Sequence, residues 1–320
     1  MIGYSSWKVL LNSFNGAISR QFHNRSPREC SKALIFAIRY RLLPLLPHLP
    51  SHIALVRTLS HPCSAELTKR HPSIEYKYLR TYIASELSIK ERLHILQNHH
   101  QYLQKIVPPD FFARIFDSRI LLWEYEAEQH VLSVSMSYPH SPRNTQEQFD
   151  QEGDISLIFE VDSSPIYKLN FSIVPGSVFK IESNQALFIG CLQGAYGKFD
   201  LIKTAAAACE KTHPAVLLSF AAAAIAESLN IHVVIGASER RQLCADDNKS
   251  VFDYDKFWQD LGAHRTSSNV FLLPVPFPFK PIESIKRPYR SKAMRKHAFI
   301  QTFSQQVKAS FDRALLTSPQ

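Results

Sequence analysis

The sequence lacks any long apolar run. No stretch of about eighteen apolar residues occurs in its 320 positions, so no transmembrane helix is predicted. The first twenty residues also lack the charged start, the unbroken apolar core and the small-residue cleavage site of a secretory signal. We therefore predict a cytoplasmic protein, either free or attached peripherally to a membrane. The periplasm is the less favoured alternative.

Cysteine is scarce and scattered. The five cysteines are odd in number and include no C-x-x-C pair, so neither a disulfide framework nor a zinc knuckle is indicated. There are fourteen histidines, but none has H-E-x-x-H or comparable metal-ligand spacing. The serine elbow of hydrolases, the Walker A loop and the dinucleotide glycine fingerprint are absent too. No metal site is predicted.

The composition is that of an ordinary globular protein, with an excess of Lys and Arg over Asp and Glu. Apolar residues make up 45% of the chain and charged residues 20%, which excludes disordered and fibrous classes. The net charge of +9 favours anionic partners such as nucleic acid, phospholipid headgroups or phosphorylated glycolipid. Charge alone does not choose among them.

The N-terminal third has helical apolar spacing. Residues 31–60 are predicted to form short helices interrupted by prolines, and residues 72–106 longer helices. Ser88 followed by Glu91 is a capping box that begins the second of the longer helices. Residues 1–70 are therefore predicted to be a helical or irregular N-terminal segment.

Beyond residue 120 the apolar period changes to two, which predicts strands at 121–125, 132–136, 154–162 and 166–174. Short connections make these strands antiparallel neighbours. A strand at 186–191, helices at 199–210 and 214–229, a strand at 231–235, a helix at 252–262 and a strand at 271–274 follow. The prediction is an α+β domain over 71–300 with a mainly antiparallel central sheet flanked by helices, and a C-terminal helical tail over 301–320.

Three of only nine glycines fall at 190, 194 and 197, between a predicted strand and a predicted helix. Open backbone N–H groups at such a junction can bind a phosphate, and glycine lets the phosphate come close. The alternative is that the glycines serve a tight turn and close packing of strand and helix. The predicted cofactor-binding residues are Gln193, Gly194, Ala195, Tyr196, Gly197 and Lys198.

Two residues are candidate general bases. His213 precedes a predicted helix, and histidine titrates near neutral pH. Glu239 follows the strand that ends near Ser238, at the carboxyl edge of the sheet where α/β proteins commonly bind ligands. The alternative for His213 is an ordinary surface or core histidine.

A basic segment follows the last predicted strand. Arg and Lys recur there every three or four residues, which predicts one basic helical face suited to anionic lipid or glycolipid. A solvated helix face is the alternative, and no fold signature favours nucleic acid. The residues predicted to contact such a partner are Lys286, Arg287, Arg290, Arg295 and Lys296.

Several separated motifs together resemble the VirK/YbjX family of bacterial proteins, over roughly residues 70–300. They are Leu192-Gln193-Gly194, the helix from Thr204 to Pro214, Ile231 to Ser238, Tyr254 to Trp258 with Leu261-Gly262, Leu273-Pro274 and the basic segment through Arg295. The resemblance implies a link to virulence, envelope integrity and survival of antimicrobial peptides, with no established catalytic residues. Ala263 and the His213-Pro214 turn depart from the family pattern.

A second resemblance concerns the order of elements. Antiparallel strands, then a strand leading through a Gly-bearing loop into a helix, then another strand, is similar to the order in acyl-CoA-dependent N-acyltransferases. It implies that residues 193–198 would hold the pyrophosphate of an acyl-CoA, on an enzyme that modifies an envelope or protein substrate. Here a second helix intervenes before the next strand, and the arginine-bearing loop motif of that superfamily is incomplete.

Overall fold

The computed structural model describes residues 43–127, 129–139, 151–243 and 252–316. They form two compact units, which we describe separately. Unit 1 comprises the described residues up to Tyr82 and Leu87–Ala113, and unit 2 comprises Ile83–Glu86 and the chain from Arg114 onward. The predicted segment boundaries at 70 and 300 lie at the end of one helix and inside another.

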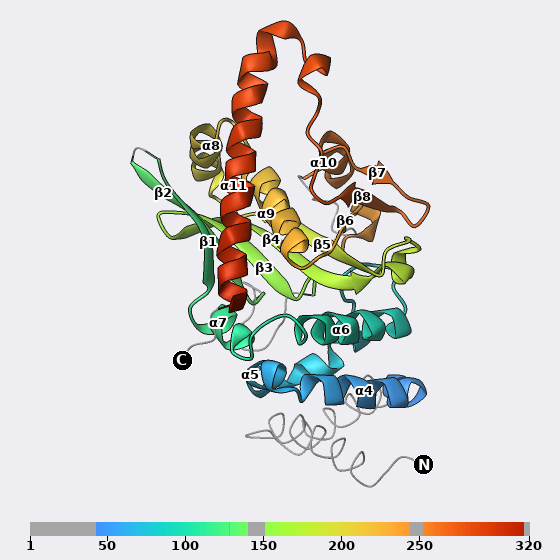
Figure 1. Ribbon diagram of the computed structural model, residues 1–320. Helices are drawn as coiled ribbons and strands as arrows, with labels where there is room; N and C mark the ends of the chain where they lie inside the picture. Colours follow the sequence, from blue (N-terminus) through green and yellow to red (C-terminus); the bar gives the residue numbers. More distant parts are fainter. Residues whose placement is uncertain (1–42, 128, 140–150, 244–251, 317–320) are drawn as a thin grey trace. The chain divides into compact units, whose positions relative to one another are not determined.

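Unit 1 consists mainly of helices (Figure 1). The predicted capping box is present: the Ser88 hydroxyl accepts from the Glu91 N–H at 3.2 Å, and the Glu91 carboxylate accepts from the Ser88 N–H at 2.8 Å. The stretch from Pro72, predicted as a regular helix, is a 3-10 helix instead. The elements are α3 (Leu43–Leu45), η2 (Leu46–His48), α4 (Leu49–Leu59), α5 (Pro62–Arg70), η3 (Pro72–Leu79), α6 (Ile89–Leu103) and the first residues of α7 (Phe111–Asp117).

The core of unit 1 lies between α4, α5, η3 and α6. Leu55, Leu67 and Leu96 are fully buried, as the helical spacing requires of the inward face. One buried polar pair lies among them: the Tyr78 hydroxyl and His52 Nδ1 are 3.1 Å apart. Burial lowers the pKa of His52 to about 4, because the imidazolium would lose its hydration there.

Unit 2 is built on an eight-stranded sheet with the order β1-β2-β3-β4-β5-β6-β8-β7. Its first five strands are consecutive antiparallel neighbours, a pairing that short connections predict for the first four. The prediction of an α+β fold with a mainly antiparallel sheet and helices before it is confirmed. The strands are β1 (Ile120–Ala127), β2 (His130–Ser137), β3 (Ile155–Val161), β4 (Ser164–Pro175), β5 (Gln185–Gly194), β6 (Val233–Ala237), β7 (His264–Arg265) and β8 (Val270–Pro274).

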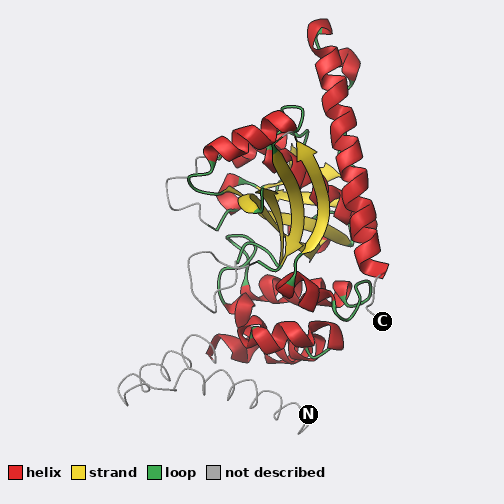
Figure 2. Ribbon diagram, turned by 90° about the vertical axis from the view of Figure 1, so that its left-hand side faces the viewer, coloured by secondary structure: helices red, strands yellow, loops and turns green. Residues whose placement is uncertain are grey.

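The helices α8 to α11 of unit 2 follow the order expected from the sequence, and the 3-10 turns lie between the predicted elements. Figures 1 and 2 show α11 lying alongside the sheet, with one end extending past it. It packs through Phe303 against Trp123 of β1, with ring centroids 5.0 Å apart. No helix in the described ranges combines the length and the apolar character needed to cross a bilayer. The elements are η4 (Gly176–Phe179), α8 (Phe199–Ala208), α9 (Pro214–Ser228), η5 (Glu239–Arg241), α10 (Tyr254–Asp260), η6 (Ile282–Ser284), η7 (Arg287–Tyr289) and α11 (Arg290–Leu316).

Candidate functional site

The candidate site lies where β5 and β6 part. They form the sheet's one parallel pair within the described residues, and their pairing joins only Leu187–Ile189 to Val234–Gly236. Beyond Ile189, β5 runs on to Gly194 while β6 ends at Ala237. The last residues of β5 therefore have a backbone edge that β6 does not cover.

Tyr254, from the first turn of α10, occupies part of that uncovered edge. Its hydroxyl accepts a hydrogen bond from the Leu192 N–H at 3.1 Å and donates one to the Leu192 carbonyl at 2.8 Å. Burial, followed by the nearby Cys191, raises the pKa of Tyr254 well above its ordinary value. The phenol is therefore protonated at neutral pH and holds a proton beside β5.

α10 is fixed in place by contacts with the end of β6. The Trp258 indole donates to the Ala237 carbonyl at 2.9 Å, and its ring lies against Gly236, where a Cβ would come within 2.3 Å of it. Glycine is therefore required at 236 for α10 to approach the sheet. Asp253 caps the helix by accepting from the Lys256 N–H at 2.9 Å, which orients Tyr254 in the first turn.

Two of the three clustered glycines have packing roles. Gly190 lies at the bulge where β5 carries one more residue than β4, and a Cβ there would be 2.1 Å from the Glu152 carbonyl oxygen. Gly194 ends β5, paired with Tyr167, and a Cβ there would be 3.1 Å from the Tyr167 ring. The strand predicted to stop at Cys191 therefore extends three residues further, and Gly194 belongs to it.

Gly197 is different, because its φ of 74° requires a left-handed backbone and its Cβ position faces open space. It lies within a turn closed by the Lys198 N–H donating to the Ala195 carbonyl at 3.2 Å. The Ala195 N–H is also bonded, to the Ile166 carbonyl at 2.8 Å. Within the described residues, the amides of Tyr196, Gly197 and Phe199 donate no hydrogen bond.

The surface around this turn carries exposed aromatic rings, the basic residues Lys198 and Lys203, and one carboxylate, Asp200 of the first turn of α8. Tyr196 is fully exposed and Phe199 is 66% exposed, on either side of Lys198. The Lys203 ammonium lies 4.3 Å from the centroid of the Phe199 ring. The predicted residues 193–198 thus form the end of a strand followed by a turn. Gln193 is exposed in the strand end, and the amides without a hydrogen bond lie in the turn.

His213 lies near the same strand end. Its ring contacts Tyr167 at 5.3 Å between centroids, and its Nδ1 accepts from the Ala215 N–H at 3.2 Å as the N-cap of α9. Burial lowers the pKa of His213, which keeps the ring neutral. Because Nδ1 is the acceptor, the neutral ring carries its proton on Nε2 and has no second lone pair with which to act as a base.

Glu239 lies on the other side, at the start of the turn after β6. Its N–H donates to Asp255 Oδ1 at 2.9 Å, and Asp255 Oδ2 is 2.9 Å from an Arg265 nitrogen. The Glu239 side chain is exposed, and its carboxylate makes no hydrogen bond or ion pair within the described chain. Asp255 links Glu239 to α10, the helix that carries Tyr254. Glu239 and Tyr254 therefore both border the point where β5 and β6 part.

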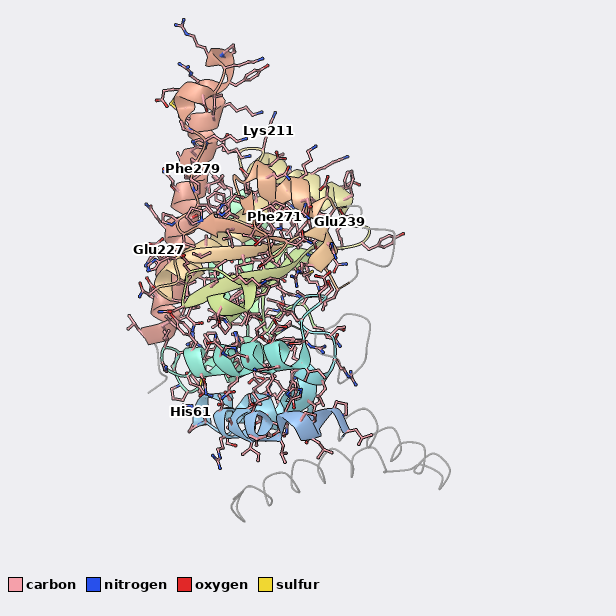
Figure 3. All side chains as sticks on the ribbon, turned by 90° about the vertical axis from the view of Figure 1, so that its right-hand side faces the viewer. His61, Lys211, Glu227, Glu239, Phe271 and Phe279 are labelled. Atoms are coloured by element: carbon pink, nitrogen blue, oxygen red, sulfur yellow. The ribbon has the colours of Figure 1, made fainter. Side chains whose placement is uncertain are left out.

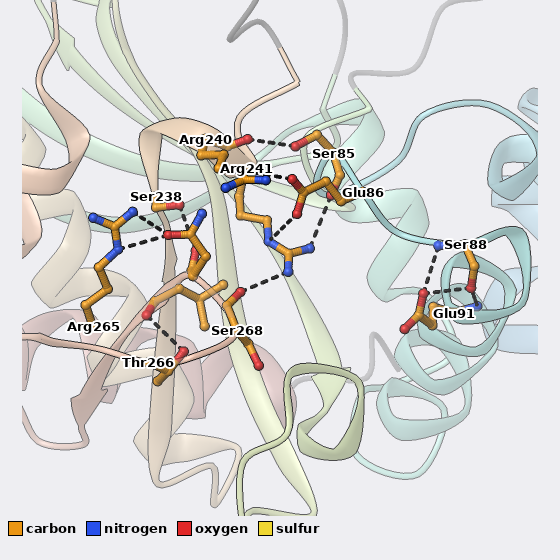
Figure 4. A network of polar contacts seen from close by, with 12 residues as sticks. Ser85, Glu86, Ser88, Glu91, Ser238, Arg240, Arg241, Arg265, Thr266 and Ser268 are labelled. Carbon is orange, nitrogen blue, oxygen red and sulfur yellow. Dashed lines mark hydrogen bonds and ion pairs between the residues drawn. The ribbon is translucent and has the colours of Figure 1, made fainter.

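A polar network holds the turn that carries Glu239 (Figure 4). Ser85 donates from its N–H to the Arg241 carbonyl at 3.0 Å and from its hydroxyl to the Arg240 carbonyl at 2.8 Å. Glu86 pairs with Arg240 at 3.0 Å and Arg241 at 3.6 Å. The sequence does not reveal this role of Ser85 and Glu86, because no local pattern connects them to residues more than 150 positions away.

The basic residues do not share one helical face, contrary to the prediction. Lys286 and Arg287 precede α11 in and beside the short turn η7, whereas Arg290, Arg295 and Lys296 belong to α11. Among the described residues, no three His, Cys, Asp or Glu side chains gather as a metal site.

Comparison with known proteins matches residues 25–309 to the family described as "Protein of unknown function (DUF535)". The chain belongs to this family. It is also 24% identical over 306 residues to the "Uncharacterized protein YbjX" of Escherichia coli (strain K12), covering 91% of this chain and 85% of that protein. The resemblance to VirK/YbjX proteins is thereby confirmed. The link to virulence, envelope integrity and peptide resistance stays a prediction.

Proposed function

We propose that the protein binds an acyl-CoA thioester at the end of β5 and transfers the acyl group to an amine. The observation that carries the proposal is the parallel β5–β6 pair, which ends after Ile189 and Gly236 in an otherwise antiparallel sheet. Such a split leaves strand backbone available to an extended ligand such as pantetheine, which carries amide donors and acceptors of its own.

The turn after β5 suits the pyrophosphate of the ligand. The amides of Tyr196, Gly197 and Phe199 make no bond within the described chain, and the space beside Gly197 is open. A helix N-terminus adds partial positive charge and Lys198 a full one, against the single negative charge of Asp200 in the first turn of α8. Tyr196 and Phe199 offer exposed rings on which an adenine could stack.

The chemistry follows from the groups at the split. The amine nitrogen attacks the thioester carbonyl, the C–N bond forms and the C–S bond breaks. Once the ligand displaces the Tyr254 phenol from Leu192, the phenol gives its proton to the departing thiolate and the exposed carboxylate of Glu239 takes the proton that the amine loses. Proton exchange with water then returns Glu239 to the carboxylate and Tyr254 to the phenol. Glu239 is preferred over His213 as the base, because the His213 Nδ1 lone pair caps α9.

Ligand titration monitored by thermal unfolding tests the proposal. Acetyl-CoA or a long-chain acyl-CoA at about a hundred times its dissociation constant should stabilise the fold by about 2.7 kcal/mol. ATP is the control for general polyphosphate binding, and CoA itself separates recognition of the carrier from recognition of the acyl chain. Absence of stabilisation by every thioester, or equal stabilisation by ATP, would refute acyl-CoA binding.

A second candidate is an accessory role in the bacterial envelope that protects against antimicrobial peptides. It rests on what the resemblance to VirK/YbjX proteins implies and on the basic segment around Lys286 to Lys296. Complementation tests it: an Escherichia coli strain that lacks YbjX would be exposed to a cationic peptide with and without this chain. If this chain fails to change survival in a strain where YbjX does so, the accessory role does not extend to it.

A further inference from the structure

The N-terminal end of α11 extends past the sheet of unit 2 (Figure 1). Residues 280–297, which we call the basic tip, include η6, η7 and the first residues of this helix. The first buried residue of α11 is Ile300, and none of the ten residues before it, about 15 Å of helix, is buried. Phe299, the last of these ten, still contacts Trp123 and Tyr125 of β1.

The basic tip is held in one conformation. The Arg290 guanidinium donates to the carbonyls of Ile285 at 2.9 Å and Glu283 at 3.0 Å, which ties the turn to the start of the helix. Phe279, at its base (Figure 3), lies between Phe220 of α9 and His297 of α11, with ring centroids 5.5 and 4.5 Å away. Little ordering is therefore needed when a partner binds.

The charge of the basic tip is largely uncompensated. It contains seven Lys and Arg residues and one carboxylate, Glu283. Arg295 lies 3.6 Å from Glu210, but none of the other cations pairs with a carboxylate within the described chain. Partial burial and then the neighbouring Lys292 lower the pKa of Lys296, and the second of these causes is repulsion between neighbouring cations. An anionic partner would relieve this repulsion.

Apolar side chains stand among these cations. Tyr289 is 61% exposed and Met294 51% exposed, beside Arg290 and Arg295. A thioether and a phenol ring gain little from a phosphodiester backbone, but both partition favourably into the headgroup region of a bilayer. The cations surround the end of one helix and form no extended stripe that could follow a nucleic acid.

We propose that the basic tip docks on a bilayer containing anionic phospholipid, with Lys286, Arg287, Lys292 and Lys296 at the headgroups and Tyr289 and Met294 entering the interface. This inference does not depend on acyl transfer, because the turn after β5 takes no part in it. A failure of acyl-CoA binding would leave it standing, and a failure of membrane docking would leave the thioester proposal standing.

Co-sedimentation with vesicles tests the docking. The full chain is mixed with phosphatidylcholine vesicles, with or without phosphatidylglycerol, at low and high salt. Each surface cation contributes about a fivefold factor, so changing Lys286, Arg287, Lys292 and Lys296 to Gln together should weaken binding to anionic vesicles roughly several hundredfold. The control changes the exposed Lys90, Lys105, Lys180 and Lys256 to Gln and alters the net charge equally.

The outcomes separate the possibilities. Binding that requires phosphatidylglycerol, weakens with salt and is lost in the tip variant but kept in the control supports docking. Additional loss on changing Tyr289 and Met294 to Ser supports insertion. Equal binding by both four-residue variants overturns the proposal, and so does tighter binding of the wild type to an RNA or DNA oligonucleotide than to anionic vesicles at the same salt.

Discussion

The hydroxyl of Tyr254 makes two hydrogen bonds with the peptide groups of a single residue, Leu192, which lies 62 positions away in the sequence. It accepts from the Leu192 N–H and donates to the Leu192 carbonyl, on the part of β5 that β6 does not cover. A side chain thus makes the backbone hydrogen bonds that a neighbouring strand would otherwise make with this edge of β5. A hydroxyl can be displaced from that edge more easily than a strand.

Changing Tyr254 to Phe should separate a structural from a chemical role. The buried N–H and carbonyl of Leu192 would lose their partner, so the free energy of unfolding should fall by about 1–3 kcal/mol. If the phenol also protonates the thiolate, turnover of acyl-CoA should fall about a hundredfold or more while the Michaelis constant for acyl-CoA changes little.

The matched control is Tyr78→Phe in unit 1, which removes another buried and hydrogen-bonded hydroxyl. It should lower stability by a similar amount and leave turnover unchanged. Stopped-flow or steady-state release of the CoA thiol measures turnover, and urea titration measures stability. Equal turnover in the two variants would limit Tyr254 to a structural role.

Gly197 and Gly262 form a matched pair for testing the phosphate site. Both have positive φ, 74° and 89°, and at both a Cβ would meet nothing within 4 Å. Replacing either by Ala should cost about 1–2 kcal/mol of backbone strain, with no steric clash. Only Gly197→Ala should also weaken CoA binding, measured by calorimetry, because only that methyl group would stand beside the open amides. Equal CoA affinity in both variants would contradict a pyrophosphate site at this turn.

Gly190 and Gly194 should respond differently to the same substitution. A Cβ at Gly190 would lie 2.1 Å from the backbone oxygen of Glu152, whereas at Gly194 it would lie 3.1 Å from the Tyr167 ring, which can move slightly. We expect Gly190→Ala to destabilise unit 2 by about 3 kcal/mol or more and Gly194→Ala by about 1 kcal/mol or less. Chemical denaturation of both variants checks the order, and a larger loss at Gly194 would contradict the packing role of Gly190.

The sequence predicts β1 to β4 because apolar residues alternate with polar ones along them, which produces the period of two, whereas β5, β6 and β8 stand out as short apolar runs. The predicted end of β5 at Cys191 is three residues too early, because a glycine in a sequence can mark a turn, a bulge or a close approach of backbone. Gly190 lies at a bulge with a close approach, and the turn comes only at Gly197. The two-residue β7 is too short for any period to show.

The candidate site is less visible in the sequence. The turn around Gly197 could be predicted from local glycine spacing, and so could the position of Glu239 after β6. The contact of Tyr254 with Leu192 could not, since it depends on how α10 packs on Gly236 through Trp258. The Asp253 cap before an aromatic run was the available local sign, and it predicts a helix start but not what the first turn faces.

His52 should make unit 1 sensitive to acid. Its pKa is about 4 in the folded protein against 6.5 for the ordinary group, so the unfolded chain binds the proton first as pH falls. Stability is therefore complete above about pH 6.5 and declines through the window down to about pH 4, with a loss of roughly 2 kcal/mol between about pH 7 and pH 5. Tyr76 and Tyr78, the rings that contact His52, are neutral in this range and cannot compensate. Urea unfolding followed by circular dichroism, compared between wild type and His52→Phe, measures the effect. A pH slope that the substitution leaves unchanged would assign the acid sensitivity to other groups.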